Sequence, residues 1–295
     1  MSVDLSLLPP PAVVEPLDFE SILAAAKSDA LAVFPELADV LALESDPVTK
    51  LLQVFVYREL LLRARINDSA RAVMLASATG SDLDQLAALF GVARLMLDPG
   101  DPAATPPVAP TLETDADLRR RTQLAPEGFS VAGPEGAYIF HALSVADVLD
   151  ASVTSPAPGE VLVSVLSRTG DGTAGPDLVL AVAAALTATD VRPLTDQVTV
   201  QSAQIVPYAV TATLWTLPGP DAAVVLATAQ LRVQSLVEST RRLGRDIARS
   251  ALIAALHVDG VQRVDLTEPA ADIVMSAKQA GAASAVTIIS GGVNV

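Results

Sequence analysis

The stretch GPDLVLAVAAALTATDVRPLTDQVTV, residues 175–200, decides the fold class because it couples a helix-starting triplet to a strand. Glycine can serve as a helix N-cap, proline fits the first helical position, and aspartate then faces the positive end of the helix dipole. The same triplet recurs at residues 219–221, again between a β-like run and an alanine-rich run. The second half of the chain therefore predicts strand–helix–strand–strand–helix–strand, an α+β pattern of ferredoxin-like, split βαβ character.

Apolar periodicity extends this prediction in both directions. A helix is expected from Asp115, with a break from Pro126 to Pro134, and Asp246 is expected to cap a short helix from Ile247 to His257. The remaining strands and helices of the second half are expected at residues 135–143, 148–154, 161–166, 176–188, 197–203, 207–217, 261–267 and 286–289.

The first half of the chain is predicted to be helical. One or two helices interrupted at Pro35 precede a long helix that starts at Asp46-Pro47 and runs to about Thr79. Within it, LLQVFVYRELLL (51–62) is apolar on nearly every face, and such a helix must be buried on every side. It forms either the core of a small helical domain or one part of a bundle that another chain completes.

Composition shifts divide the chain into five predicted segments. A proline-rich arm that either frays or docks on a neighbour comes first, and a linker with five prolines separates the helical domain from the α/β modules. The segments are the arm (1–18), the N-terminal helical domain (19–97), the Pro-rich linker (98–113), the middle α/β domain (114–203) and the C-terminal α/β domain (204–295).

Charge and composition exclude several classes of function. The net charge of −15 argues against nucleic-acid binding, because phosphate contacts need clustered Lys and Arg. No run is typical of a membrane span or a secretory signal, and the absence of cysteine suits a reducing cytoplasm. His141 and His257, the two histidines, lack the carboxylate spacing of a metal site, so we expect no metal, no cofactor and no enzymatic activity.

One glycine-rich loop offers an alternative function. Residues 170–175 (GDGTAG) fit G-x-G-x-x-G between a strand and a helix, which is typical of a nucleotide-binding loop. However, Pro176 removes a backbone donor, and Asp171 and Asp177 place negative charge where a phosphate would bind. We therefore interpret the segment as a strand-to-helix loop and keep a nucleotide- or metabolite-binding protein as the alternative.

The arginine clusters have two readings. Arg241 and Arg242 lie in the last turn of a predicted helix, where they favour its dipole, and Arg245 follows closely. In so acidic a chain the same residues, and the run at residues 119–121, are also candidates for salt bridges between subunits.

Four blocks in the same order resemble one known family. They are DPVTKLLQVFVYRELLLRARINDSARAVMLASATGSDLDQLAALFGVAR (46–94), DADLRRRTQLAPEGFSVAGPEGAYIFHAL (115–143), DVRPLTDQVTV (190–200) and RRLGRDIARSALIAALHVDGVQRVDL (241–266). Together they are similar to the baseplate assembly protein J family of contractile-tailed bacteriophages and phage-tail-like bacteriocins. Pro126 departs from the family's pattern, because it lies where the resemblance implies that the helix after the arginine run continues.

The resemblance implies a structural subunit of the baseplate wedge, assembled in the host cytoplasm and located in the virion tail or a tail-like particle. In that family two copies of the chain join one copy of a smaller wedge protein, and their N-terminal helices form a shared bundle. Further implied partners are neighbouring wedges, a lysozyme-like-fold wedge protein attached to the sheath, and the tail hub and spike. The residues expected to form bundle contacts between chains are Leu51, Leu52, Phe55, Val56 and Ile66.

Overall fold

The computed structural model describes residues 5–9, 11–130, 133–189, 191–219 and 221–293. Its internal contacts divide the chain into two compact units. The first unit contains residues 1–94 and 114–123, and the second contains residues 95–113 and 124–295. The architecture is α+β, as the sequence predicts.

The first unit is helical. The predicted interruption at Pro35 is confirmed, because Pro35 starts a 3₁₀ turn between two helices. The long helix begins at Pro47, with the Asp46 carboxylate accepting from the Val48 N–H at 2.8 Å. The elements are α1 (Phe19–Val33), η2 (Pro35–Leu37), α2 (Ala38–Leu41), α3 (Pro47–Ala72), α4 (Gly80–Ala88) and the first part of α5 (Asp115–Gly128).

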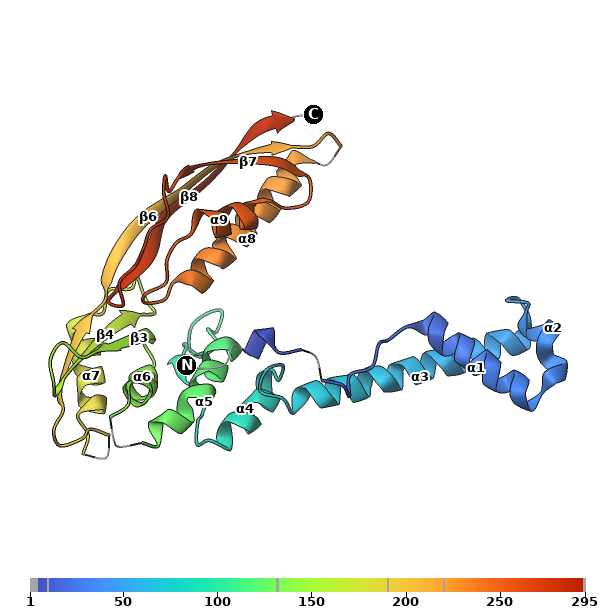
Figure 1. Cartoon of the computed structure of the whole chain (residues 1–295), viewed down its shortest axis with the longest axis horizontal. Coiled ribbons are helices and arrows are strands. Elements are labelled where there is room, and N and C mark those ends of the chain that lie inside the picture. The colour runs from blue at the N-terminus through green and yellow to red at the C-terminus, as the bar shows by residue number, and fades with distance from the viewer. Residues whose placement is uncertain (1–4, 10, 131–132, 190, 220, 294–295) are drawn as a thin grey trace. The chain divides into compact units, whose positions relative to one another are not determined.

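α3 ends at Ala72, earlier than the predicted end near Thr79. The Ser77 hydroxyl donates to the Arg71 carbonyl at 2.8 Å, so a side chain satisfies a carbonyl at the end of the helix and the chain leaves in a series of turns. α1 lies alongside α3 (Figure 1), and Ile22 and Leu23 of α1 share a buried cluster with Val56 of α3.

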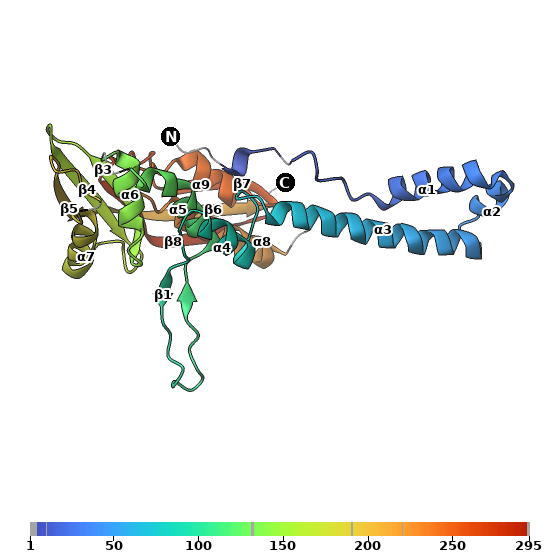
Figure 2. The same cartoon turned by 90° about the horizontal axis from the view of Figure 1, so that it is seen from below.

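The second unit opens with a ribbon where the composition predicts a linker. β1 (Met96–Asp98) pairs antiparallel with β2 (Thr111–Leu112), and Asp101 and Val108 exchange both backbone hydrogen bonds farther out. The segment therefore runs out and folds back on itself (Figure 2). Its two ends meet, because the Glu113 N–H donates to the Leu95 carbonyl at 2.9 Å. These residues therefore form a paired ribbon and not the extended linker that the composition predicts.

The first sheet of the second unit has the strand order β3-β4-β5. β4 and β5 are parallel with Val163 opposite Val200, and the helix between them makes this a βαβ crossover. Two helices pack on the sheet around Tyr138, Val163 and Val182. The elements are α6 (Glu135–Leu143), β3 (Val148–Thr154), β4 (Glu160–Ser167), α7 (Pro176–Leu186) and β5 (Gln197–Ser202).

The second sheet has the order β7-β6-β8, with β6 antiparallel to β7 and parallel to β8. Two helices cover one face of it (Figure 1), and its core is built around Leu214, Val233 and Leu256. The elements are β6 (Gln204–Thr216), α8 (Ala222–Thr240), α9 (Arg249–Leu256), β7 (Val261–Glu268) and β8 (Gln279–Val293).

The two predicted strand–helix–strand halves lie in separate three-stranded sheets, so within the described ranges no single four-stranded ferredoxin-like sheet forms. The reason is the junction at residues 202–204. Ala203 N–H donates to Val165 O in the first sheet, and the next residue, Gln204, donates to Lys278 O beside the second. A tight hairpin between these strands would favour Gly, Asn or Asp in the turn, and Ser-Ala-Gln contains none of these.

The two triplets start their helices differently. Gly175 is the N-cap of α7 and Pro176 its first residue, as predicted, but the N-cap of α8 is Asp221, whose carboxylate accepts from the Ala223 N–H at 2.9 Å. Pro220 lies outside the described residues.

Two further expectations were wrong. Asp246 accepts from the Met275 N–H rather than capping α9, and the Asp272 carboxylate accepts from Arg249 N–H in the first turn at 2.7 Å. Pro126 lies inside α5, where the helix continues to Gly128.

Candidate assembly surface

α3 presents a stripe of exposed apolar side chains, which we call the α3 stripe. Its members recur at spacings of three, four and seven residues, so they lie on one face of the helix. They are Val48, Leu51, Phe55, Leu62 and Ile66. Leu51, Phe55 and Ile66 are 57%, 60% and 58% exposed. Side chains of this kind are worth about 1.5–3 kcal/mol each when fully buried, so the stripe is a strong candidate for contact with another chain.

The residues predicted to form the bundle divide into two groups. Leu51, Phe55 and Ile66 belong to the α3 stripe, whereas Leu52 packs against the cluster that contains Ile22. Val56 is 2% exposed and belongs to that cluster, so it lies in the core of its own chain. The face of α3 that carries Leu52 and Val56 is therefore already used by α1.

The N-terminal arm is fixed to the same helix. Asn67, buried on α3, accepts from the Glu15 N–H at 3.0 Å and donates to the Glu15 carbonyl at 2.8 Å. The Glu15 carboxylate binds Arg63 at 2.8 Å, and Arg63 also pairs with Glu59, one turn earlier on α3, at 2.7 Å. Residue 15 thus docks on its own chain beside the helix.

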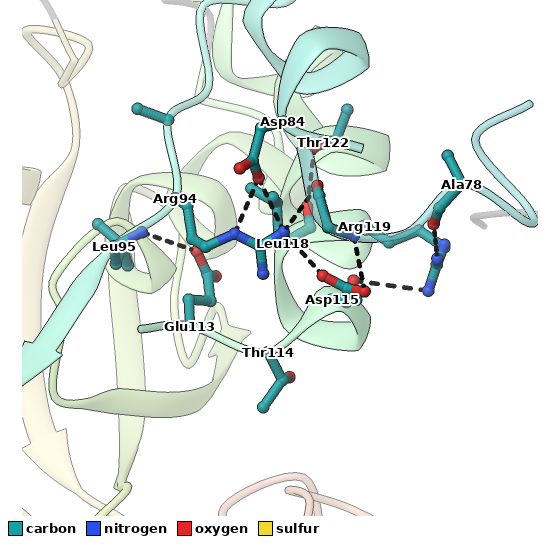
Figure 3. A network of polar contacts seen from close by, with 12 residues as sticks. Ala78, Asp84, Arg94, Leu95, Glu113, Thr114, Asp115, Leu118, Arg119 and Thr122 are labelled. Carbon is teal, nitrogen blue, oxygen red and sulfur yellow. Dashed lines mark hydrogen bonds and ion pairs between the residues drawn. The ribbon is translucent and has the colours of Figure 1, made fainter. Parts of the chain in front are cut away.

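A network of polar contacts holds α4 and α5 together (Figure 3). Arg94, whose side chain is 13% exposed, donates to Asp84 on α4 and to Asp115 at the start of α5, each at 2.7 Å between Nη2 and Oδ1. The Gly80 N–H donates to the other oxygen of Asp115 at 3.1 Å. The Gly80 N–H and the Arg94 side chain lower the pKa of the Asp115 carboxyl, since both stabilise its charged form.

Two of the three arginines at residues 119–121 have local roles. Arg119 donates through Nε to the Leu75 carbonyl at 2.7 Å and through Nη2 to the Ala78 carbonyl, which fixes the turn after α3 (Figure 3). Arg121 is buried and donates to the Ala93 carbonyl at 2.6 Å. These two side chains build the unit rather than a contact with another chain.

Of the three C-terminal arginines predicted as interface residues, two bind carbonyl groups of their own chain and one is exposed. Arg241 donates to the Gly170 carbonyl at 2.8 Å, and Arg242 donates to the Leu149 carbonyl at 3.2 Å. Beside them, Leu243 N–H donates to the buried Asp150 carboxylate at 2.8 Å. Arg245 is exposed and remains available as an interface residue.

Two backbone N–H groups of the glycine-rich loop already have hydrogen-bond partners within the chain. Asp171 accepts from the Thr173 N–H at 2.9 Å, which lowers the pKa of that carboxyl, and Ala174 N–H donates to the Ser202 hydroxyl at 2.9 Å. Gly172 has φ of +106°, a conformation that favours glycine. These glycines shape a turn, and a phosphate would have to compete with bonds that already exist.

A cavity of about 440 Å³ lies beside this loop. Its polar lining includes the carboxylates of Asp171 and Glu238 and only one basic side chain, that of Arg241. Such a balance of charge disfavours a phosphate group, so the nucleotide alternative gains no support from the geometry.

The described residues contain neither a metal-binding cluster nor a membrane-spanning helix. No cluster of three or more His, Cys, Asp or Glu side chains in these ranges could hold a metal ion. Within the same ranges, every helix is too short or too polar to span a bilayer.

Comparison with known proteins gives matches along the chain. Models of the baseplate J-like N-terminal, central and C-terminal domains match residues 44–101, 130–202 and 208–289. Baseplate protein J of Escherichia phage P2 is 48% identical over 296 residues, which cover 98% of each chain. A chain in the cryo-electron microscopy structure of the anti-feeding prophage baseplate aligns at a TM-score of 0.38 and 16% identity, over 60% of this chain and 43% of that one.

Proposed function

Because this chain belongs to the baseplate J-like family, whose members are structural proteins of phage baseplates, we propose that it is a wedge subunit of a contractile-tail baseplate. The observation that carries the proposal is the α3 stripe, an apolar face on the longest helix of the chain. The role is structural: the chain binds other subunits and transmits their movement, and it converts no substrate.

The α3 stripe is the surface through which the wedge assembles. α1 and the docked arm occupy one side of α3, which leaves the stripe for helices of other chains. We assign it to a bundle of two copies of this chain and one smaller wedge protein. An interface of this kind resembles a domain core cut in half, which accounts for the high mean hydropathy of +0.45 in a chain without a membrane-spanning helix among its described residues.

The second unit serves contacts outside the bundle. Its C-terminal sheet joins one wedge to the next around the tail hub and spike, and the sheath-linked wedge protein binds nearby. The chain passes between its two compact units at residues 94–95, 113–114 and 123–124, and we place the pivot for sheath contraction at these crossings.

Co-expression with the products of neighbouring genes tests the assignment of the stripe. Phe55→Asp places a charge in the proposed bundle, so the smaller partner should no longer co-purify. Leu89→Asp is a matched control, because Leu89 is also an exposed apolar residue of the first unit but lies outside the stripe. If Phe55→Asp retains the partner at the wild-type ratio, the stripe is not the bundle surface.

A further inference from the structure

The second sheet has two edges of opposite character. β7 carries Arg263, Asp265 and Glu268, and Arg249 of α9 donates to its Leu266 carbonyl at 3.0 Å. Charged side chains and capped carbonyls are the usual protection of an edge strand against pairing with another strand. The β7 edge is therefore blocked.

β8 forms the other edge and has none of this protection. Its fifteen residues, Gln279–Val293, contain no charged side chain and no proline, in a chain with a net charge of −15. Only its first residues are covered on the outer side, where Leu243 bridges Ala280 and Gly244 N–H donates to Gln279 O. From Ala282 onward, the described residues supply no second strand beside it.

Two bulges define the part of β8 that is able to pair. The register against β6 skips Ser284 and Gly291, which leaves a regular stretch over Ala285–Ser290. Its sequence, AVTIIS, combines high β-propensity with no charge, no proline and no glycine, which is the signature of segments that pair with copies of themselves.

The side chains of this stretch already have defined environments on both faces of the sheet. Val286 and Ile288 pack against the core under α8 and α9, so the strand is held firmly in place. Thr287 and Ile289 point to the opposite face and are exposed, Ile289 at 52%. Within the described ranges, no strand pairs with the outer row of backbone N–H and C=O groups of this stretch.

We propose that the outer edge of β8 pairs antiparallel with the same edge of a second copy of this chain. The two three-stranded sheets then join as one sheet of six strands around a two-fold axis near Thr287. A second copy fits because the contact is self-complementary, and because two strongly acidic chains approach at least cost through a surface that carries no charge. The inference rests on the proposed function only in that wedges meet through their C-terminal sheets.

Single cysteines test the contact, because the chain has no cysteine of its own. A two-fold axis through the sheet places a residue of the outer face opposite itself, at Cβ separations of about 4.5–5.5 Å that a disulfide spans after a small adjustment. Ala285→Cys, Thr287→Cys and Ile289→Cys cover the three central registers. We expect one of them to give a disulfide-linked dimer of the full chain under mild oxidation, and Gln262→Cys on β7 to stay monomeric.

A charge on the edge provides a second measurement by sedimentation of the full chain over a concentration series. Thr287→Lys should raise the Kd of self-association on the order of tenfold or more, since like charges then face each other across the axis. Gln262→Lys on β7 should leave that Kd at the wild-type value. If no cysteine variant crosslinks above Gln262→Cys, or if the two lysine variants behave alike, the proposal is overturned.

The two proposals fail separately. Thr287→Lys should still co-purify with the smaller wedge protein, and Phe55→Asp should still crosslink through the β8 cysteine that reacts in the wild-type background. If Phe55→Asp retains the partner while a β8 cysteine crosslinks, only the bundle assignment fails. If no β8 cysteine crosslinks while Phe55→Asp loses the partner, only the β8 proposal fails.

Discussion

The side chain of Asn67 forms both backbone hydrogen bonds of Glu15, accepting from its N–H at 3.0 Å and donating to its carbonyl at 2.8 Å. An asparagine amide thus takes the place of a neighbouring strand and fixes the N-terminal arm on α3. Because Asn67 is 2% exposed, these bonds form away from competing water.

Asn67→Ala should release the arm and lower the free energy of unfolding by about 1–3 kcal/mol, since two buried hydrogen bonds are lost. Urea unfolding followed by circular dichroism measures the change, and limited proteolysis should show faster cleavage before residue 18. Ser69→Ala on an exposed position of α3 should change neither quantity. Equal protease resistance in Asn67→Ala and wild type would show that the arm is held by other contacts.

Adjacent residues of α3 should respond in opposite ways to the same substitution. Val56→Asp buries a charge against Ile22 and should unfold the first unit, because an unpaired buried carboxylate costs several kcal/mol. Phe55→Asp should change the stability of the isolated chain by no more than about 0.5 kcal/mol, because its side chain is exposed. Thermal unfolding of both variants tests the orientation of α3, which is wrong if Phe55→Asp is the more damaging of the two.

Glycine substitutions distinguish a structural loop from a ligand-binding loop. At Gly172 an added Cβ would lie 2.6 Å from Leu166 Cδ1 at a φ of +106°, so Gly172→Ala should cost about 1–3 kcal/mol. Gly170→Ala, with no atom within 4 Å, should cost about 1 kcal/mol through its positive φ alone. Fluorescence of Trp215, the single tryptophan, reports the unfolding of the second unit. Equal stability of the two variants would remove the structural reason for Gly172.

The contacts of Asp115 with the Gly80 N–H and with Arg94 should give the first unit a pH dependence in the acid range. The pKa of Asp115 is lowered in the folded chain, so its contribution to stability is complete above the unfolded pKa of about 4 and is lost as pH falls through the lower folded pKa. Asp115→Asn should weaken that acid dependence of the unfolding free energy, and Arg94→Gln should reduce it through the same pair. A pH profile identical to wild type in both variants contradicts the assignment.

Local patterns predicted most elements of this fold. Pro35, Asp46-Pro47 and Gly175-Pro176 start helices where the sequence places them, because capping depends on residues within one turn. The cap of α9 could not be found in this way, since Asp272 comes from a segment 23 residues beyond Arg249. The assignment of neighbouring strands to different sheets at Ala203 likewise depends on pairing partners far along the chain.

The assembly surface could be predicted only in part. The sequence of α3 indicates a helix that must be covered on all sides, but Phe55 and Val56 are equally apolar and nothing local tells which faces α1. The β8 edge was missed, although a charge-free strand in a strongly acidic chain was a visible signal. It gains meaning only once the sheet order places β8 at an edge.

The native mass of this chain, co-expressed with the products of its neighbouring genes, tests the central claim most directly. The account predicts a discrete complex that holds two copies of this chain and one smaller partner, and that loses the partner in Phe55→Asp. A monomer that binds none of the neighbouring gene products would contradict a wedge subunit assembled through α3.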